Sequence, residues 1–205
     1  MQLAKAAGCA VSTTTNGMLF NDEVCSRVIN SGMDLISFSL AGTGPANDYY
    51  RRGTSLSAAL RAMERLAGYR SKAGSPRPAI HVSYLLLRSA ADELTRLPDL
   101  LASAGVDAVV VSTLDFVPVP ELAGESFVGA GPSMLAEVRS LVEKVAGDCK
   151  ARGTRLHYRL PGGKTGGRPC AENPLRAVYV AADGSVSPCV FTKAPPECPR
   201  FLIGG

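Results

Sequence analysis

Hydrophobic and polar residues follow two different periodicities along the first 150 residues. Residues 34–42 (DLISFSLAG) predict a strand, because Ile36, Phe38 and Leu40 fall on one face and serines on the other. Residues 54–68 instead carry apolar side chains at helical spacing. The same patterns predict strands at 10–15, 79–87 and 106–113, and helices at 21–30, 91–105 and 132–153.

The alternation of strands with helices predicts an α/β fold built on a parallel sheet. Each strand–helix–strand unit is expected to cross over right-handed. The strands are mostly apolar runs, as in sheets covered on both faces or closed into a barrel. Residues 1–153 are therefore expected to form a partial (β/α) barrel of about four to five parallel strands with helices.

The pattern changes after residue 153. Residues 154–169 contain one more candidate strand (TRLHYRL) and a glycine-rich run that we interpret as a linker, since a phosphate-binding loop would require glycine at Tyr158. Residues 170–205 contain a predicted β-hairpin that turns at Asp183-Gly184, between Cys170 and Cys189. A disulfide, a metal site and two unrelated buried cysteines are all compatible with that placement.

Charge and cysteine content narrow the classes of function. The net charge is +4, and the basic cluster around Arg152 and Arg168 is better explained as solvated surface than as a nucleic-acid interface, because no aromatic residues interleave it. No apolar run is long enough to cross a bilayer, so we expect a cytoplasmic protein with no membrane or nucleic-acid partner. Three isolated cysteines, Cys9, Cys25 and Cys149, are expected to be small buried core residues.

Several segments resemble one enzyme superfamily. The spacing C-x13-G-x4-C from Cys170 to Cys189 resembles the opening of a SPASM or twitch domain, the auxiliary iron–sulfur module of many radical SAM enzymes. Residues 13–17 (TTTNG) and 36–42 (ISFSLAG) resemble the third and fourth strands of the radical SAM barrel, and residues 50–66 resemble the segment that follows.

Other features depart from that resemblance. The sequence contains no C-x3-C-x2-C triplet for the catalytic cluster, and Ala41 stands where an aspartate is frequent in the family. After Cys189 it contains only one further cysteine, Cys198. The chain therefore resembles the middle of a larger enzyme and is expected to be inactive alone.

The resemblance also implies site residues. Ser39 would contact S-adenosylmethionine, Arg51 or Arg52 would pair with its carboxylate, and Asn16 would belong to the same site. Without the resemblance, Ser39 could equally be a small packing residue and the arginines solvated. The remaining implied residues are the ligands of an auxiliary [4Fe–4S] cluster in the intact parent, namely Cys170, Cys189 and Cys198.

The implied chemistry is radical modification of a peptide or small molecule after reductive cleavage of S-adenosylmethionine. Two alternatives remain: a non-catalytic, cluster-free binding or partner module, and an α/β domain with buried cysteines and no iron. Because the neighbours of strand 10–15 would be missing, an exposed sheet edge is expected there, with possible association of chains through it.

Overall fold

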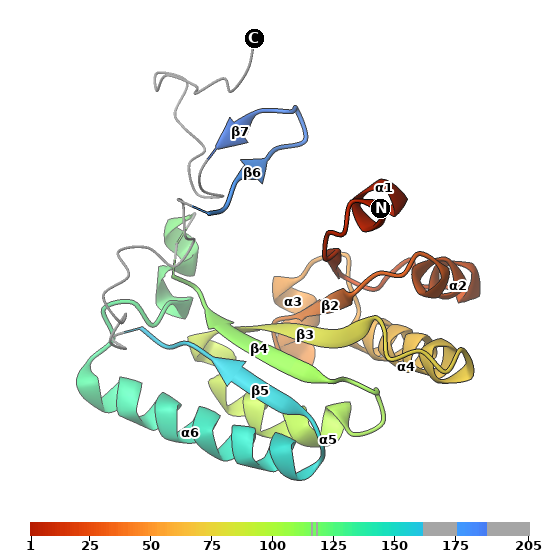
Figure 1. Ribbon diagram of the computed structural model, residues 1–205. Helices are drawn as coiled ribbons and strands as arrows, with labels where there is room; N and C mark the ends of the chain where they lie inside the picture. Colours follow the sequence, from red (N-terminus) through yellow and green to blue (C-terminus); the bar gives the residue numbers. More distant parts are fainter. Residues whose placement is uncertain (116, 118, 162–175, 188–205) are drawn as a thin grey trace. The chain divides into compact units, whose positions relative to one another are not determined.

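The computed structural model contains one parallel sheet with its strands in chain order, β1-β2-β3-β4-β5 (Figure 1). It describes residues 1–115, 117, 119–161 and 176–187. Because spatial order equals chain order, same-handed crossovers place the connecting helices on one face of the sheet. The strands are β1 (Ser12–Thr15), β2 (Leu35–Leu40), β3 (Ala79–Leu86), β4 (Ala108–Thr113) and β5 (Arg155–Tyr158). The α/β prediction is confirmed, and β5 is the candidate strand at 154–160.

The helices begin where the sequence provides caps. The side chain of Asn21 accepts a hydrogen bond from Val24 N at 2.9 Å, as predicted for this helix start. The helical segment expected at 91–105 has two parts, a 3-10 segment and a short α-helix, and Pro98 lies in the first turn of the second part as predicted, where no N–H is needed. The helical segments are α1 (Gln2–Ala6), α2 (Asp22–Asn30), α3 (Pro45–Tyr50), α4 (Leu56–Lys72), η1 (Arg88–Arg96), α5 (Leu97–Leu101), η2 (Pro120–Glu125) and α6 (Pro132–Ala151).

One face of the sheet forms the core. Ile36, Phe38 and Leu40 are almost completely buried, which confirms the alternation predicted for this strand. Fully burying a side chain such as Phe38 contributes about 1.5–3 kcal/mol. Helices α4, α5 and α6 cover this face (Figure 1).

The cysteine predictions were right for two residues and wrong for one. Cys25 and Cys149 are buried among the helices that cover the sheet. Cys9 is exposed, because it follows α1, a short helix that buries no residue, and precedes the edge strand β1.

The opposite face of the sheet mixes polar and apolar side chains, and we call it the open face. Helices α4, α5 and α6 do not cover it (Figure 1). Val110 on β4 is 42% exposed there, although its neighbours Val109 and Val111 are buried. The strands contribute small or polar side chains to this face, among them Thr14, Ser37, Ser39, His81, Ser83 and His157. The sheet is thus an incomplete barrel wall with one apolar side and one mixed side.

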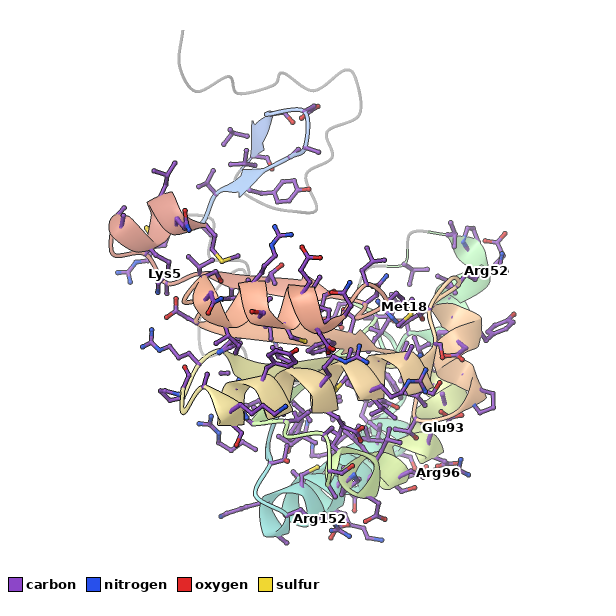
Figure 2. The ribbon with its side chains drawn as sticks, turned by 90° about the vertical axis from the view of Figure 1, so that its right-hand side faces the viewer. Lys5, Met18, Arg52, Glu93, Arg96 and Arg152 are labelled. Atoms are coloured by element: carbon purple, nitrogen blue, oxygen red, sulfur yellow. The ribbon has the colours of Figure 1, made fainter. Side chains whose placement is uncertain are left out.

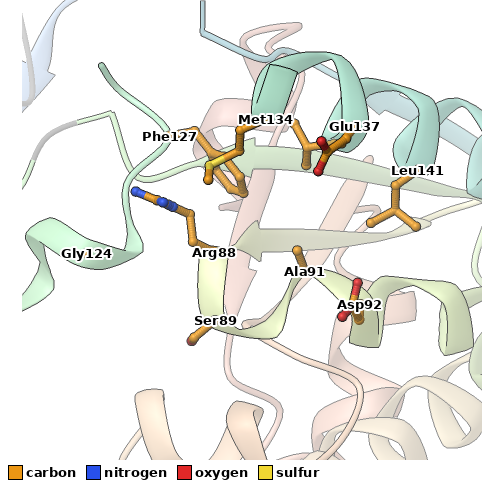
Figure 3. Close-up of a pocket in the computed structure, with 10 residues that line it drawn as sticks. Arg88, Ser89, Ala91, Asp92, Gly124, Phe127, Met134, Glu137 and Leu141 are labelled. Atoms are coloured by element: carbon orange, nitrogen blue, oxygen red, sulfur yellow. The ribbon is translucent and has the colours of Figure 1, made fainter. Parts of the chain in front are cut away.

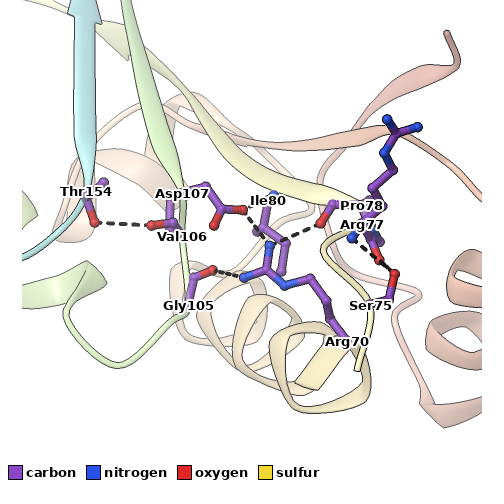
Figure 4. A network of polar contacts seen from close by, with 9 residues as sticks. All are labelled: Arg70, Ser75, Arg77, Pro78, Ile80, Gly105, Val106, Asp107 and Thr154. Carbon is purple, nitrogen blue, oxygen red and sulfur yellow. Dashed lines mark hydrogen bonds and ion pairs between the residues drawn. The ribbon is translucent and has the colours of Figure 1, made fainter. Parts of the chain in front are cut away.

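A polar network ties the end of α4 to the amino-terminal ends of β3 and β4 (Figure 4). The Arg70 guanidinium donates to Asp107 Oδ2 at 2.5 Å and to the carbonyl oxygens of Pro78 at 3.1 Å and Gly105 at 3.0 Å. The same Asp107 oxygen accepts from Ile80 N at 2.7 Å. The Arg70 side chain therefore satisfies carbonyl groups just before two neighbouring strands, β3 and β4.

The Asp34 carboxylate connects segments at the amino-terminal edge of the sheet, beside β2. Asp34 accepts from Val11 N at 2.8 Å and pairs with Lys5 at 2.6 Å and with Arg77. These contacts join the segments before β1, β2 and β3.

The chain divides into two compact units, Met1–Gly162 and Gly163–Gly205. In the second, β6 (Tyr179–Val180) pairs antiparallel with β7 (Val186–Ser187). Gly184 adopts φ +81° in the connecting turn, which confirms the predicted Asp183-Gly184 hairpin. Cys170, Cys189 and Cys198 lie outside the described residues.

The Arg70 network generates a stability prediction. Arg70→Ala should lower the free energy of unfolding by about 2 kcal/mol, because it removes a partly buried charge pair and leaves carbonyl groups unsatisfied. Arg152→Ala is the matched control, since the partner of Arg152, Asp99, is exposed, and should cost less than about 1 kcal/mol. Urea denaturation of both variants measures the difference; equal losses would contradict a special role for Arg70.

Candidate functional site

The strands β1, β2 and β3 end together at the carboxyl edge of the sheet. Thr15 pairs with Phe38 and Ser39 pairs with Ser83, so Asn16 follows β1 at the level of Ser39. Figure 2 shows Met18, Arg52 and Glu93 toward one end of this unit and Lys5 toward the other. Parallel α/β structures carry their functional groups at this carboxyl edge.

In the turn after β1, the side-chain oxygen of Asn16 accepts a backbone hydrogen bond that holds this side chain in place. Asn16 Oδ1 accepts from Met18 N at 3.0 Å, and Thr15 Oγ1 accepts from Gly17 N at 3.1 Å. Gly17 has φ +81°, and a Cβ there would lie 3.1 Å from the Phe38 ring. Within the described residues, Asn16 Nδ2 has no hydrogen-bond partner, so a donor remains available at the strand end.

The loop after β2 folds around a carboxylate from η1. Thr43 N donates to Glu93 Oε2 at 2.9 Å, and Thr43 Oγ1 donates to the Glu93 carbonyl at 2.5 Å. A Cβ on Gly42 would lie 2.9 Å from this carboxylate, and one on Gly44 would lie 3.1 Å from it. Ala41 N donates to the buried Asn47 Oδ1 at 2.9 Å. Glu93 and Asn47 together determine the path of this loop, and sequence analysis had missed both.

The two candidate arginines differ in their surroundings. Arg51 follows α3 and is half-buried, and its Nε is buried without a hydrogen-bond partner in the described part of the chain. Burial lowers the pKa of this guanidinium, which nevertheless stays charged at any physiological pH. Arg52 is exposed. A buried, unsatisfied N–H carries a cost that an anionic acceptor would remove.

Ser39 lies on the open face near the end of β2. Its neighbour Ser37 shares a hydrogen bond of 2.7 Å with Ser83, whereas the Ser39 hydroxyl has no partner among the described residues. Asn16 and Ser39 are therefore adjacent strand-end groups with unused donors. No hydrogen bond in the described structure joins Arg51 or Arg52 to either of them.

A carboxylate cluster links three segments beyond the carboxyl edge. Tyr50 OH donates to Glu125 Oε1 at 2.7 Å and lies 3.0 Å from Ser89 Oγ, while Ser89 N donates to Glu125 Oε2 at 3.0 Å. Burial opposes ionisation of Glu125, but these hydrogen bonds outweigh it and hold its pKa below the usual value. The carboxylate raises the pKa of Tyr50 in turn. Segments after β2, β3 and β4 are thereby fixed to one another.

A groove of about 580 Å³ lies between η1 and α6 (Figure 3). Phe127, Met134 and Leu141 supply apolar lining, and Arg88 and Glu137 supply charges. Helices η1 and α6 belong to the helical layer, so the groove lies on the side of the sheet away from Ser39.

The described residues contain no group of three histidine, cysteine or acidic side chains arranged to hold a metal ion. Within the same residues, no helix combines the length and apolar character needed to cross a bilayer. The proposed cluster ligands Cys170, Cys189 and Cys198 fall in the undescribed segments and are untested by this structure.

Sequence comparison finds a relative that matches most of this chain. The chain is 27% identical over 188 residues to the tungsten-containing aldehyde ferredoxin oxidoreductase cofactor-modifying protein of Pyrococcus furiosus. The match covers 90% of this chain and 50% of that protein, so the chain spans about half the length of the relative. No family model matches the sequence.

Structural comparison identifies the fold. SuiB of Streptococcus suis superposes with a TM-score of 0.62 at 13% identity, over 91% of this chain and 45% of SuiB. A domain of pyruvate-formate lyase-activating enzyme from Bacteroides vulgatus gives 0.53 at 11% identity, over 77% of this chain and 86% of that domain. A radical SAM methyltransferase from Sphaerobacter thermophilus superposes with a TM-score of 0.51 at 15% identity, over 77% of this chain and 43% of the methyltransferase. The chain therefore shares its fold with proteins that include a radical SAM enzyme.

The Glu125 cluster generates a pH-dependent prediction. Because the folded-state pKa of Glu125 is depressed, its contribution to stability is present above pH 4.5, the ordinary value, and is lost as pH falls through the folded pKa. Tyr50→Phe should cost about 1 kcal/mol at neutral pH and progressively less below that value. Chemical denaturation of both proteins from neutral to acidic pH measures this. A cost independent of pH would show that the lost hydroxyl does not stabilise the carboxylate.

Proposed function

We propose that this chain is the central part of a radical SAM enzyme that modifies a peptide, and that S-adenosylmethionine binds at the carboxyl edge of its sheet. The observation that carries the proposal is the buried, unpartnered Nε of Arg51 beside this edge. Support comes from the sequence motifs and from the relative described as cofactor-modifying. Structures of SuiB bound to S-adenosylmethionine and to the precursor peptide SuiA share this fold.

The residues present fit the cofactor chemically. A planar guanidinium binds a carboxylate through paired hydrogen bonds, so Arg51 would hold the carboxylate of S-adenosylmethionine. The Ser39 hydroxyl and the Asn16 amide would donate to other polar groups of the same ligand. The Thr43–Glu93 contact would keep the neighbouring loop in one conformation for this ligand.

The iron–sulfur part of the proposal concerns the second unit. Cys170, Cys189 and Cys198 would ligate an auxiliary [4Fe–4S] cluster, although such a cluster normally requires four thiolates. With a reduced catalytic cluster, for which this sequence has no cysteine triplet, S-adenosylmethionine would supply radical chemistry. Arg51, Ser39 and Asn16 of this chain would bind and orient it. The sequence lacks the C-x3-C-x2-C triplet, so we propose that the chain is inactive by itself and acts as part of a longer cytoplasmic protein.

A second candidate function is a cluster-free binding or partner module. The missing cysteine triplet favours it, and it would use the same fold without radical chemistry. The exposed edge of β1 would then be a surface for association, since β2 is the single strand paired with β1 in the described sheet.

The two arginines provide a matched test of cofactor binding. Arg51→Ala should weaken S-adenosylmethionine binding by roughly tenfold or more, because it removes a charge-assisted carboxylate contact. Arg52→Ala should change the affinity less than about twofold, because an exposed side chain is screened by solvent. Titration calorimetry on the full 205-residue chain measures both.

The outcomes separate the two candidate functions. Undetectable binding of S-adenosylmethionine to the unaltered chain would favour the cluster-free module. Equal effects of the two substitutions would contradict the role given to Arg51.

A further inference from the structure

Strand β5 and the residue that follows it carry basic side chains that the proposed function does not use. Arg155, His157 and Arg159 are all exposed and occupy alternate positions; we call these three residues the basic stripe. The intervening Leu156 and Tyr158 pack against the hydrophobic core. A period of two places the members of the stripe on the same side of the strand.

The basic stripe begins on the open face. Arg155 pairs with Ala108 and His157 pairs with Val110, whose 42% exposure marks the uncovered side of the sheet. Burial lowers the pKa of His81, and Arg155 and His157 lower it further against the opposing effect of Asp107. Arg155 lies in register with Ala108 and His81 across the sheet, so the stripe places basic groups on the open face.

The stripe has no acidic partner within the described residues. The ion pairs found there use Lys5, Arg27, Arg65, Arg70, Arg77 and Arg152. No described hydrogen bond or ion pair uses a side chain of the basic stripe. The guanidinium groups of Arg155 and Arg159 repel one another, and an anionic ligand would remove that repulsion.

The outer edge of β5 also offers backbone groups. In the described sheet β5 pairs with β4 alone. Arg155 N donates to Asp107 O at 3.2 Å, so the alternate residues Leu156 and Tyr158 direct their N–H and C=O groups to the free edge. Such an edge can accept an extended segment as an additional strand.

We propose that the free edge of β5 binds an extended acidic segment of the substrate peptide, with Asp or Glu at alternate positions beside the basic stripe. This inference rests on the proposed function, which supplies the peptide. In an added strand, side chains directly opposite each other lie about 5 Å apart, close enough for each carboxylate to meet one basic group. Apolar residues between the acidic ones would lie beside Leu156 and Tyr158.

The sequence argues against a second copy of this chain as the occupant. No two of its 18 acidic residues are separated by one intervening residue, so no segment presents the required alternation. The acidic segment therefore lies outside these 205 residues.

The test uses the full chain and short fluorescent peptides, with binding followed by anisotropy in the absence of S-adenosylmethionine. In the first peptide glutamate alternates with valine, in the second glutamine replaces glutamate, and the third has the first composition with its glutamates contiguous. The first should bind about tenfold more tightly than the other two, since it alone places each charge opposite the stripe. Equal binding of the three peptides would overturn the inference.

Substitutions in the basic stripe test the same contact by changing the protein and not the peptide. Replacing Arg155 and Arg159 together by Gln should weaken binding of the alternating peptide by about tenfold. Arg61→Gln on α4, an exposed arginine in the helical layer, should leave it unchanged. If the double variant binds as well as the unaltered chain, or if a single-stranded oligonucleotide binds the stripe more tightly than the peptide, the inference is wrong.

Hydrogen exchange provides a readout that does not depend on the variants. The amides of Leu156 and Tyr158 should become protected when the alternating peptide binds. A chain that binds this peptide but not S-adenosylmethionine would overturn the cofactor site alone. A chain that binds the cofactor but not the peptide would overturn this inference alone.

Discussion

The handedness of the β–helix–β crossovers is the constraint on which the rest of this structure depends. Five parallel strands in chain order, each connected in the same sense, place the helices on one face of the sheet. That face receives Ile36, Phe38 and Leu40 and becomes the core. The other face carries the serines, threonine and histidines of the strands among smaller apolar residues, so polar groups of several strands lie side by side on it.

The two ends of the sheet differ in how their buried side-chain donors are satisfied. At the amino-terminal end, Arg70 and Asp107 satisfy each other and the adjoining backbone, and Asp34 does the same beside β2. At the carboxyl end, Arg51 Nε is buried without a partner. The carboxyl end also contains satisfied contacts, such as Thr43–Glu93, so the difference lies in the few donors there that have no partner among the described residues.

Local sequence patterns predicted the helices, strands and turns, but they did not predict contacts between residues far apart in the sequence. The alternation around Phe38, the cap at Asn21 and the turn at Asp183-Gly184 depend on neighbouring residues, and each was confirmed. Cys9 was wrongly assigned to the core, because its apolar neighbours AAGCAV look the same whether or not a helix packs there.

The contacts of the candidate site could not be predicted in the same way. The Thr43–Glu93 hydrogen bond spans 50 residues and the Tyr50–Glu125 bond spans 75, and neither exists before the sheet forms. The alternation Arg155, Leu156, His157 is visible in the sequence. Whether these residues can bind an added strand depends on β5 lying at the edge of the described sheet, and the local sequence cannot specify that position.

Hydrogen exchange of the full chain with and without S-adenosylmethionine tests the central claim most directly, because it locates the ligand without requiring turnover. The account predicts added protection at Asn16–Met18, in the loop that contains Thr43 and around Arg51, with no change near Asp34 or Asp107. Protection confined to the amino-terminal end of the sheet, or none at any position under saturating ligand, would contradict it.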